Sequence, residues 1–443
     1  MRRFKALDQS HHSVGYAEQF FFIPHFLKLC KNEGAMRLSG SEISSRPGTR
    51  SSRELLRSAD GGVEVTVMEG LFWLSAIGVV YPYLGYPVLL WLVSGMLGRF
   101  RPHTQDDSSF YPSISMIIPA CNEESRIERK IENTKALRYP ADRLQVLFVS
   151  DGSTDRTVEL IRKHEADPIA LIELPVRGGK AAALNAGLDR ARHDVVVFSD
   201  ASIELEPDAL RYIVQGFRDP GVGCISGEDM IAESGGEAWY GRYELLVRRL
   251  ESRVHSIVGA SGSFYAQRRE LCEPFTEGLA PDFLSVLRTV EKGFRAVSEP
   301  AAVGMMTSVK DSKQEFDRKV RTLIRGMTAL FAYRRVLNPV RFGVFAIEML
   351  SHKILRWSVP FFLIIALVSS VLLIDSPWFL FVSFVQIAFY LTALLAWWGW
   401  SLIRRSLPGK IALYFSMVNA AILVAWMKYA MGVRQELWTP SQR

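Results

Sequence analysis

Several loops of this chain carry carboxylate, lysine and glycine residues at positions suited to binding a phosphorylated ligand. Asp200 follows the apolar run Val195–Ser199 directly. Such a run is typical of a buried strand in a parallel sheet, and open α/β sheets bind ligands beyond the carboxyl ends of their strands. A carboxylate there can hold a divalent cation that bridges phosphates, or it can cap the helix expected near Pro207. This stretch alone leaves the two roles equally open.

Three further loops belong to the same expected edge of the sheet. They are Pro-Ala-Cys-Asn-Glu-Glu at 119–124, Ser-Asp-Gly-Ser-Thr-Asp at 150–155 and Arg-Gly-Gly-Lys at 177–180. The first two follow expected strands, and the third opens an expected helix. Because the carboxyl ends of parallel strands meet at one edge, these loops and Asp200 together predict a single ligand site.

The residue types in these loops indicate what the ligand contains. Asp151 can accept hydrogen bonds from the edge of a nucleobase. Gly178–Gly179 lets the backbone approach an anion closely, and Lys180 adds a positive charge for phosphate. Each loop also has a purely structural explanation, with Ser153 or Thr154 capping a helix and Lys180 solvated in a flexible turn. The occurrence of all the loops together favours the ligand site.

Short apolar runs that alternate with helical stretches must position these loops. Strands are expected at 114–118, 145–150, 169–174 and 195–199, and helices at 124–137, 154–165, 179–190 and 208–217. This alternation predicts an α/β fold, a mostly parallel sheet with helices on both faces and right-handed crossovers. The region that follows is less regular, with helices expected around 237–258, 283–292 and 316–333.

Long apolar stretches flank this α/β region. Hydrophobic residues make up 49% of the 443 residues, and apolar stretches of spanning length lie at 71–97, 355–374, 378–403 and 411–431. The basic stretch 341–356 is amphipathic, as interfacial helices are. Lys and Arg beside the spans explain the net charge of +7. No basic stripe with interleaved aromatic residues indicates nucleic-acid binding, so no nucleic-acid partner is expected. The four cysteines are far apart, which argues against a disulfide framework or a zinc site.

These patterns predict the domain organisation. It comprises a disordered N-terminal extension at 1–67, a transmembrane helix at 68–98, an α/β domain at 108–335, an interfacial helix at 341–356, three transmembrane helices at 357–431 and a tail at 432–443. We expect the extension to be dispensable, since Met68 would serve as a start. Positive charges at Arg99, Arg101 and the loop 404–410 predict that the α/β domain faces the cytoplasm.

The order of the motifs resembles the inverting family 2 glycosyltransferases, which have the GT-A fold. The closest match is the membrane-bound branch of poly-N-acetylglucosamine, hyaluronan and cellulose synthases, and it covers about residues 68–443. The resemblance implies a Rossmann-like GT-A domain inserted between transmembrane helices of a multi-pass inner-membrane protein. It also implies a nucleotide-sugar donor, with UDP-sugars expected, and a growing polysaccharide or lipid-linked glycan as acceptor at the lipid bilayer.

The resemblance assigns the donor site by position. Ala120, Glu123 and Asp151 would contact the nucleoside, and Lys180 would lie beside the diphosphate.

Asp200 would correspond to the first carboxylate of the family's Asp-x-Asp metal motif. Ser202 stands at the second position, and a hydroxyl is a weaker ligand than a carboxylate. The expected cofactor is Mg²⁺ or Mn²⁺, held by Asp200 with Ser202.

The acceptor side and the general base are assigned in the same way. Ser261, Gly262 and Ser263 resemble the loop that lines the acceptor. Asp282 corresponds to the general base, with Pro281 replacing the usual preceding acid. Inversion needs one base to deprotonate the attacking hydroxyl. The alternative for Asp282 is a cap for the helix at 283–292.

The segment 317–326 lies where processive synthases carry Gln-x-x-Arg-Trp. Arg321 matches the arginine of that motif, while Arg318 and Thr322 replace the glutamine and the tryptophan. Arg318, Arg321 and Arg325 share one helix face and could clamp a diphosphate. The alternative is a basic helix that faces anionic lipid.

Sugar transfer with inversion is therefore the expected reaction. Single transfer to a polyprenyl phosphate or other lipid is one alternative, which the altered motif around Arg321 favours slightly. A catalytically degenerate partner of a synthase, marked by Ser202 and Pro281, is another. The small number of spans leaves open whether a glycan channel forms within one chain or in a homo-oligomer.

Overall fold

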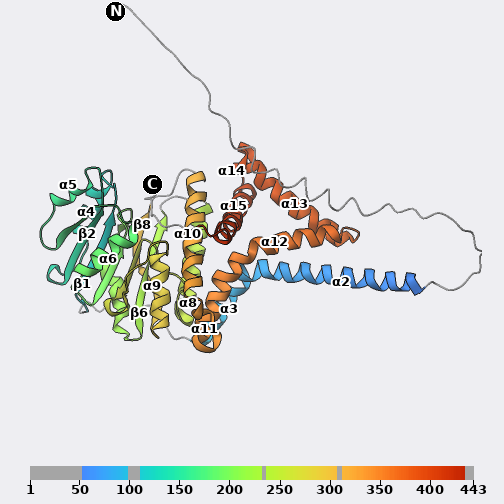
Figure 1. The fold of residues 1–443 in the computed structure, drawn as a ribbon, viewed down its shortest axis with the longest axis horizontal. Coiled ribbons are helices and arrows are strands. Elements are labelled where there is room, and N and C mark those ends of the chain that lie inside the picture. Colours follow the sequence, from blue (N-terminus) through green and yellow to red (C-terminus); the bar gives the residue numbers. More distant parts are fainter. Residues whose placement is uncertain (1–51, 98–109, 232–235, 307–311, 435–443) are drawn as a thin grey trace, which may run out of the picture. The chain divides into compact units, whose positions relative to one another are not determined.

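The computed structural model describes residues 52–97, 110–231, 236–306 and 312–434 (Figure 1). By its contacts the chain divides into two units, residues 1–60 and residues 61–443. Only the start of helix α2, which begins at Ser52, is described in the first unit. The expected extension at 1–51 and the last residues of the expected tail, 435–443, lie outside the described residues. Residues 52–67, which were expected to be disordered, belong to α2.

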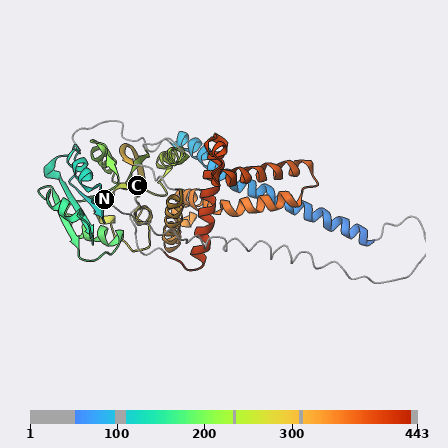
Figure 2. The same ribbon diagram turned by 90° about the horizontal axis from the view of Figure 1, so that it is seen from above.

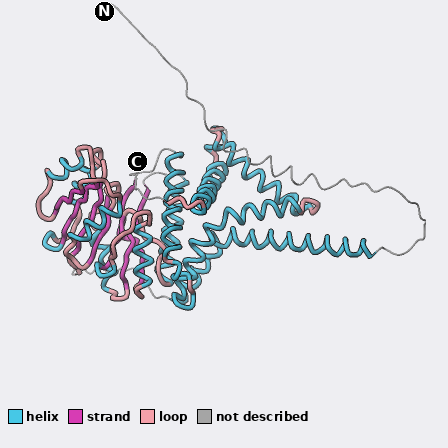
Figure 3. The backbone as a smooth tube through the Cα atoms, viewed as in Figure 1, coloured by secondary structure: helices cyan, strands magenta, loops and turns pink. Residues whose placement is uncertain are grey.

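The second unit contains an eight-stranded sheet in the order β3-β2-β1-β4-β7-β6-β8-β5, drawn in magenta in Figure 3. The strands are β1 (Ile114–Ala120), β2 (Leu144–Asp151), β3 (Ile169–Leu174), β4 (Val195–Ser199), β5 (Glu204–Leu205), β6 (Val222–Ile231), β7 (Phe264–Arg268) and β8 (Arg295–Met306). Strands β1 to β4 are parallel, as is the β6–β8 pair, whereas β7 is antiparallel to β4 and β6. The predicted α/β fold with a mostly parallel sheet is confirmed.

Side chains alternate between two hydrophobic cores, one on each face of the sheet. In β1, Ile117 packs into one core, while Met116 and Ile118 pack into the other. The period of two in a strand produces this division. The covering helices are α4 (Ile127–Lys135), α5 (Thr157–Arg162), α6 (Lys180–Arg190), α7 (Ala209–Gln215), α8 (Gly236–Val254), α9 (Pro281–Glu291) and α10 (Ser312–Ala332). The cores hold the carboxyl ends of β1, β2 and β4 at one edge.

Strands β6, β7 and β8 were not predicted from the sequence, although β3 and β4 match their expected bounds. The missed strand β6 contains two glycines and several buried polar residues, which conceal its periodicity. Close packing explains both glycines. A Cβ atom at Gly223 would lie 2.3 Å from Leu271, and one at Gly227 would lie 2.3 Å from Phe264.

Among the described residues, four helices are long and apolar enough to cross a membrane, and each of the four predicted spans overlaps one of them. They are built from α2 (Ser52–Val80), η2 (Tyr81–Gly85) and α3 (Tyr86–Leu97); α11 (Pro339–Met349), η7 (Leu350–Ile354) and α12 (Leu355–Leu372); α13 (Pro377–Trp397); and α15 (Leu407–Ala430), with the short α14 (Ser401–Arg405) between the last two. The expected interfacial stretch 341–356 is helical and continues through η7 into α12. Near its start, α11 is kinked at Gly343, where φ is +53°.

The apolar helices pack directly on the α/β domain. Tyr86 and Leu90 of α3 share a hydrophobic cluster with Val247, Leu250 and Val254 of α8. Helix α10 packs along α15. Figures 1 and 2 both show the sheet on one side of this junction and the orange to red apolar helices on the other.

Candidate functional site

The loops after β1 and β2 are joined by side-chain hydrogen bonds. Asn122 adopts a positive φ of +53°, and its Oδ1 accepts a hydrogen bond from the Thr154 amide at 2.8 Å. The alternative that Ser153 or Thr154 caps the next helix is wrong. Asp155 instead accepts the Thr157 amide at 3.0 Å, at the start of α5. The two loops therefore form one rigid surface at the sheet edge.

Asp151 is buried and holds the Gly-Gly loop in place. Its Oδ1 accepts the Gly178 amide at 2.7 Å, and its Oδ2 accepts the Gly179 amide at 2.9 Å. Gly152, at φ +57°, lets this turn approach the loop, since a Cβ there would lie 2.5 Å from the Arg177 nitrogen. The expected contact of Asp151 with a nucleoside stays a prediction, but the carboxylate already has a structural role.

Glu277 caps helix α6 from a distant segment, a role that no local pattern indicates. Its Oε1 accepts the amides of Ala181 at 3.0 Å and Ala182 at 3.2 Å. Gly179 makes room for the carboxylate with φ +91°. Burial raises the pKa of Glu277, and Arg325, whose guanidinium lies 3.9 Å away, opposes that rise. A negative charge therefore stands at the helix N-terminus, where anions are favoured.

Lys180 joins three segments that the sequence analysis had singled out separately. Its Nζ lies 2.5 Å from Asp200 Oδ1 and donates to the Gly262 carbonyl at 3.1 Å. The Asp200 amide donates to the Ser263 carbonyl at 2.9 Å. The alternative of a solvated lysine is wrong, because the Lys180 side chain is only 12% exposed. Asp200 does not cap α7 either, since Asp208 holds that N-cap position.

Asp282 lies beside Gly262, whose carbonyl accepts the hydrogen bond from Lys180. A Cβ at Gly262 would be 3.8 Å from Asp282 Cγ. The capping alternative is wrong, because α9 begins at Pro281 and its N-cap is Ala280. Burial raises the pKa of the Asp282 carboxyl, while Lys180 and Lys353 counteract the rise. A carboxylate with a raised pKa is a stronger base, as proton abstraction requires.

The loop at 261–263 is shaped by its own hydrogen bonds. Ser261 is fully buried, its hydroxyl donates to Asp229 at 2.6 Å, and the same oxygen accepts the amides of Ser263 and Phe264. The Ser261 side chain therefore fixes the loop, and Gly262 of this loop lies beside Asp282. The acceptor-side role of Ser261, Gly262 and Ser263 stays a prediction.

The expected nucleoside residues Ala120 and Glu123 lie at the end of β1. Ala120 is the last residue of that strand and is buried. The Glu123 carboxylate lies 3.0 Å from the Arg126 guanidinium. Burial raises the pKa of Glu123, and the charge of Arg126 opposes that rise.

Lys130, a buried lysine that was not predicted as a site residue, forms hydrogen bonds to residues on both sides of Asp200. Lys130 is 1% exposed, and its Nζ donates to Ser199 Oγ at 2.8 Å and to the Ile203 carbonyl at 2.7 Å. Burial lowers its pKa to about 7, and the nearby Asp200 limits the fall. Lys130 lies on the buried face of α4 with Ile127 and Ile131, although a lysine on a helix usually reaches solvent.

The three arginines of α10 reach different surroundings. Arg325 is buried between Glu277 and Asp282, and both carboxylates offset the lowering of its pKa by burial. Burial together with Arg325 and Arg318 lowers the pKa of Arg321. Arg318 pairs with Glu315 at 2.8 Å and faces the membrane helices. Arg325 is therefore the arginine of this face that the fold brings near Glu277 and Asp282.

A divalent cation would find few ligands at Asp200. The described residues contain no cluster of three or more His, Cys, Asp or Glu side chains that could hold a metal ion. One oxygen of Asp200 is already occupied by Lys180. Mg²⁺ commonly binds one or two carboxylates together with substrate phosphates. Asp200 and Ser202 therefore fit a cation that arrives with a diphosphate, and do not fit one held by the protein alone.

The similarity to known proteins covers most of the α/β domain, including the loops at this sheet edge. The family model Glycosyl transferase family 2 matches residues 115–274. A poly-beta-1,6-N-acetyl-D-glucosamine synthase of Staphylococcus aureus (strain COL) is 32% identical over 161 residues, which are 33% of this chain and 39% of that protein. A "Probable glycosyltransferase" of Bacillus subtilis (strain 168) is 31% identical over 173 residues, or 36% of this chain and 40% of that protein. The alignments thus span about two fifths of these curated relatives.

One solved structure matches most of the chain. It is a mannosyltransferase from Pyrobaculum calidifontis in complex with GDP-Man and Mn²⁺, with a TM-score of 0.62 at 22% identity, covering 82% of this chain and 99% of that one. This similarity confirms the expected GT-A fold between apolar helices. The family match ends at residue 274, before Asp282.

Proposed function

Because the chain carries a family 2 glycosyltransferase domain of the polysaccharide-synthase branch, we propose that it transfers a sugar with inversion from a UDP-sugar to a glycan or lipid-linked acceptor at the membrane. The observation that carries this proposal is the Lys180 bridge. It joins Asp200, on the expected diphosphate side, to the Gly262 carbonyl, which lies beside Asp282. Lys180 would thus connect the residues expected to bind the donor with those expected to bind the acceptor.

In the proposed reaction, Asp282 removes the proton of the acceptor hydroxyl as its oxygen attacks the anomeric carbon. The bond between that carbon and the diphosphate oxygen breaks, and UDP leaves with the bonding electron pair. Lys180 would offset the growing negative charge, and Arg321 and Arg325 of α10 would add to it. A Mg²⁺ or Mn²⁺ ion, held by Asp200 and Ser202 with the diphosphate, would supply further charge stabilisation there.

The relatives guide the choice of donor. The Staphylococcus aureus relative is a poly-beta-1,6-N-acetyl-D-glucosamine synthase, so UDP-N-acetylglucosamine is the first donor to test. We propose that the α/β domain faces the cytoplasm, where nucleotide sugars are made. Single transfer to a lipid is a second candidate, because exposed Thr322 replaces the tryptophan that processive synthases carry.

The test measures UDP release and product formation by the purified full-length protein with a panel of UDP-sugars and Mn²⁺. We expect turnover with at least one donor and its loss in Asp282→Asn, with Asp142→Asn, an exposed carboxylate of the same domain, as a control outside the site. A long polymer would exclude single transfer. Wild-type activity in Asp282→Asn would refute the base assignment, and no turnover with any donor would favour a degenerate binding partner.

A further inference from the structure

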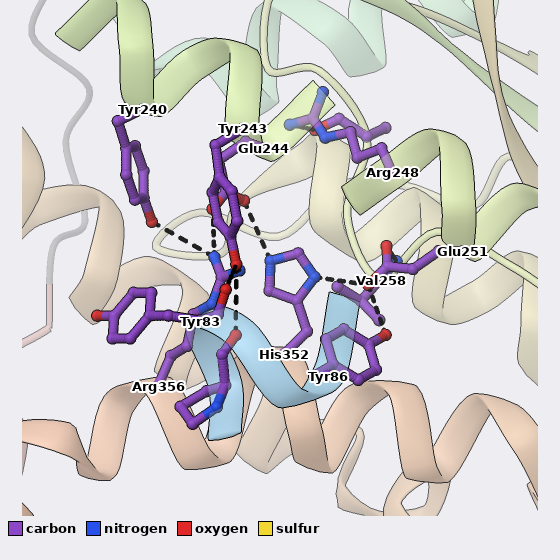
Figure 4. Close-up of polar contacts among 12 residues, drawn as sticks. Tyr83, Tyr86, Tyr240, Tyr243, Glu244, Arg248, Glu251, Val258, His352 and Arg356 are labelled. Carbon is purple, nitrogen blue, oxygen red and sulfur yellow. Dashed lines mark hydrogen bonds and ion pairs between the residues drawn. The ribbon is translucent and has the colours of Figure 1, made fainter. Parts of the chain in front are cut away.

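His352 lies where the apolar helices meet the α/β domain, with a carboxylate at each of its ring nitrogens (Figure 4). Its Nδ1 lies 2.6 Å from Glu251 Oε1, and its Nε2 lies 3.1 Å from Glu244 Oε2. Both glutamates belong to α8, whereas the histidine belongs to η7. The ring is 4% exposed, and Glu251 is fully buried. One side chain of the apolar helices thus bridges two carboxylates of the α/β domain.

Both ring nitrogens must donate in this arrangement. Glu251 already accepts the Tyr86 hydroxyl at 2.8 Å and the Val258 amide at 3.3 Å, so it is an acceptor toward the histidine as well. Burial opposes ionisation of Glu244, but the charges of Arg356 and the histidine hold its pKa well below the usual range. A neutral imidazole carries one N–H, so only the imidazolium satisfies both carboxylates. The bridge is therefore a buried, paired positive charge.

Two rare helical turns meet beside this histidine. Both η2 and η7 are π-helical, and the Tyr81 hydroxyl of η2 lies 3.0 Å from Ser351 Oγ of η7. Turns of this kind are frequently found at functional sites. His352 and Arg356 are four residues apart, so they share one helix face, and both pair with Glu244. Lys353 follows the histidine directly and therefore lies on a different part of the helix surface.

Glu251 connects the histidine to the loop that is expected to line the acceptor. Val258, whose amide donates to Glu251, lies just before that loop. Arg248 of α8 donates to the Ala260 carbonyl at 3.5 Å. The Lys353 ammonium is 3.6 Å from the Cβ position of Gly259. The segment 258–260 is therefore held from α8 and from η7 together.

Lys353 carries the effect of this arrangement to the expected base. Its ammonium lies 5.5 Å from the centre of the Phe283 ring, and Phe283 follows Asp282 in α9. Burial raises the pKa of Asp282, and the positive charge of Lys353 opposes that rise. The other charged or titratable groups around Asp282 are Lys180, Cys224, Arg248, Tyr265 and Arg325. The charges that act on Lys353 are those of Glu244, Arg248, Glu251 and Arg356. Lys353 is thus attracted by the same two carboxylates that His352 binds.

We propose that His352 is a positioning residue of the acceptor side: by donating to Glu244 and Glu251, it fixes the 258–263 loop against the apolar helices and keeps Lys353 beside Asp282. The histidine acts through these neighbours and not on the reacting atoms. Its loss should loosen the loop and weaken the effect of Lys353 on the base. The donor loops should stay in place, because the hydrogen bonds of His352 go to α8. This inference rests on the proposed glycosyl transfer, because it concerns the place where the acceptor is deprotonated.

The first experiment measures hydrogen–deuterium exchange in the full-length protein purified in detergent. His352→Gln removes the charge and leaves a donor at one end of the side chain only. We expect the amides of 258–263 to exchange about tenfold faster, as loss of one charge-assisted hydrogen bond allows, while 119–124 and 150–155 exchange as in wild type. Gln386→Leu removes a hydrogen bond to Ser370 within the apolar helices and is the control. Unchanged exchange at 258–263, or a uniform increase across the α/β domain, would overturn the proposal.

The second experiment records kcat for UDP release against pH, with UDP-N-acetylglucosamine and Mn²⁺. The acidic limb should move to higher pH in His352→Gln, as in Lys353→Gln, because the base loses an opposing positive charge. The donor KM should stay within about twofold of wild type, since the donor loops are unchanged. A purely structural role would lower the active fraction and leave the limb in place, and that result would refute the positioning role.

Two further outcomes separate this inference from protein misfolding and from the proposed function. If His352→Gln does not fold, Tyr86→Phe removes another donor to Glu251, and it must loosen 258–263 selectively for the proposal to stand. Absence of turnover with every donor would refute the proposed function. The exchange data, which need no turnover, would still decide whether His352 holds the loop.

Discussion

The Lys180 ammonium and the Asp200 carboxylate form a 2.5 Å ion pair across twenty residues of sequence. In the described structure the lysine occupies one side of the only carboxylate assigned to the metal. The pair therefore neutralises Asp200, and in the proposed reaction it would position the charge that the leaving diphosphate needs. Each partner can be altered separately, and the two changes have different expected results.

Lys180→Met should lower kcat/KM by about 100-fold, because it removes a charge aimed at the developing negative charge of the leaving group. Lys180→Arg should retain part of the activity, since the charge persists with altered geometry. Steady-state kinetics on UDP release give both values. Lys163→Met, a surface lysine of the same domain paired with Glu159, is the matched control. Equal activities for Lys180→Met and this control would remove Lys180 from the mechanism.

The pH profile should reveal Asp282. The base acts only when deprotonated, and burial raises its pKa, so activity must fall as the pH drops through that raised pKa. We expect the acidic limb of kcat against pH to lie above the usual range of an aspartate, which is near 4. Lys353→Gln removes a positive charge that opposes the rise, so it should move the limb to still higher pH. A limb that stays in place in this variant would contradict the charge coupling.

Lys130 should make stability depend on pH above neutrality. Burial lowers its pKa from 10.5 to about 7, so between these values the unfolded chain binds more protons and stability rises with pH. Below pH 7 the contribution is fully lost. Lys130→Met should flatten the rise of apparent Tm between pH 7 and 10, relative to wild type, in differential scanning fluorimetry. Lys163→Met keeps every buried group and should rise like wild type. A parallel rise in Lys130→Met would show that other groups cause it.

Glu277 offers a test of the negative charge at the N-terminus of α6. Glu277→Gln keeps an acceptor for the Ala181 amide and removes the charge that opposes an incoming diphosphate. We therefore expect a lower KM for the donor, by about threefold, at nearly unchanged Tm. Glu277→Ala loses the cap and should cost about 1 kcal/mol of stability. A higher donor KM in Glu277→Gln would show instead that the charge orients Arg325 for binding.

Much of the donor half of the fold could be predicted from the sequence. Residues 169–174 and 195–199 form strands with the expected bounds because their apolar runs are short, continuous and bounded by turn residues. The approach of Lys180 to Asp200 followed from placing their loops on one sheet edge. The second half was missed, because in β6 two glycines and the buried polar residues Ser226 and Glu228 interrupt the apolar pattern.

The hidden parts of the site are long-range pairings of residues with ordinary local roles. Glu277 stands 96 residues from the Ala181 amide that it caps, and nothing near either residue encodes the contact. Lys130 shares the buried face of α4 with Ile127 and Ile131, and lysine side chains on helices usually reach solvent. Only the folded packing shows that Lys130 is buried beside the Asp200 loop and that Lys353 faces Phe283.

Ser202→Asp tests how the site uses metal. The second carboxylate would complete an Asp-x-Asp motif with Asp200, and carboxylates hold Mg²⁺ and Mn²⁺ more strongly than a hydroxyl does. We expect the Mn²⁺ concentration for half-maximal UDP release to fall about tenfold, because one added charge-assisted ligand is worth about that factor. Titration of EDTA-treated protein gives the value, and Ser202→Ala controls for loss of the hydroxyl. If both variants and wild type turn over normally without metal, Asp200 serves only to hold Lys180, and the ion pair itself is the working element of the site.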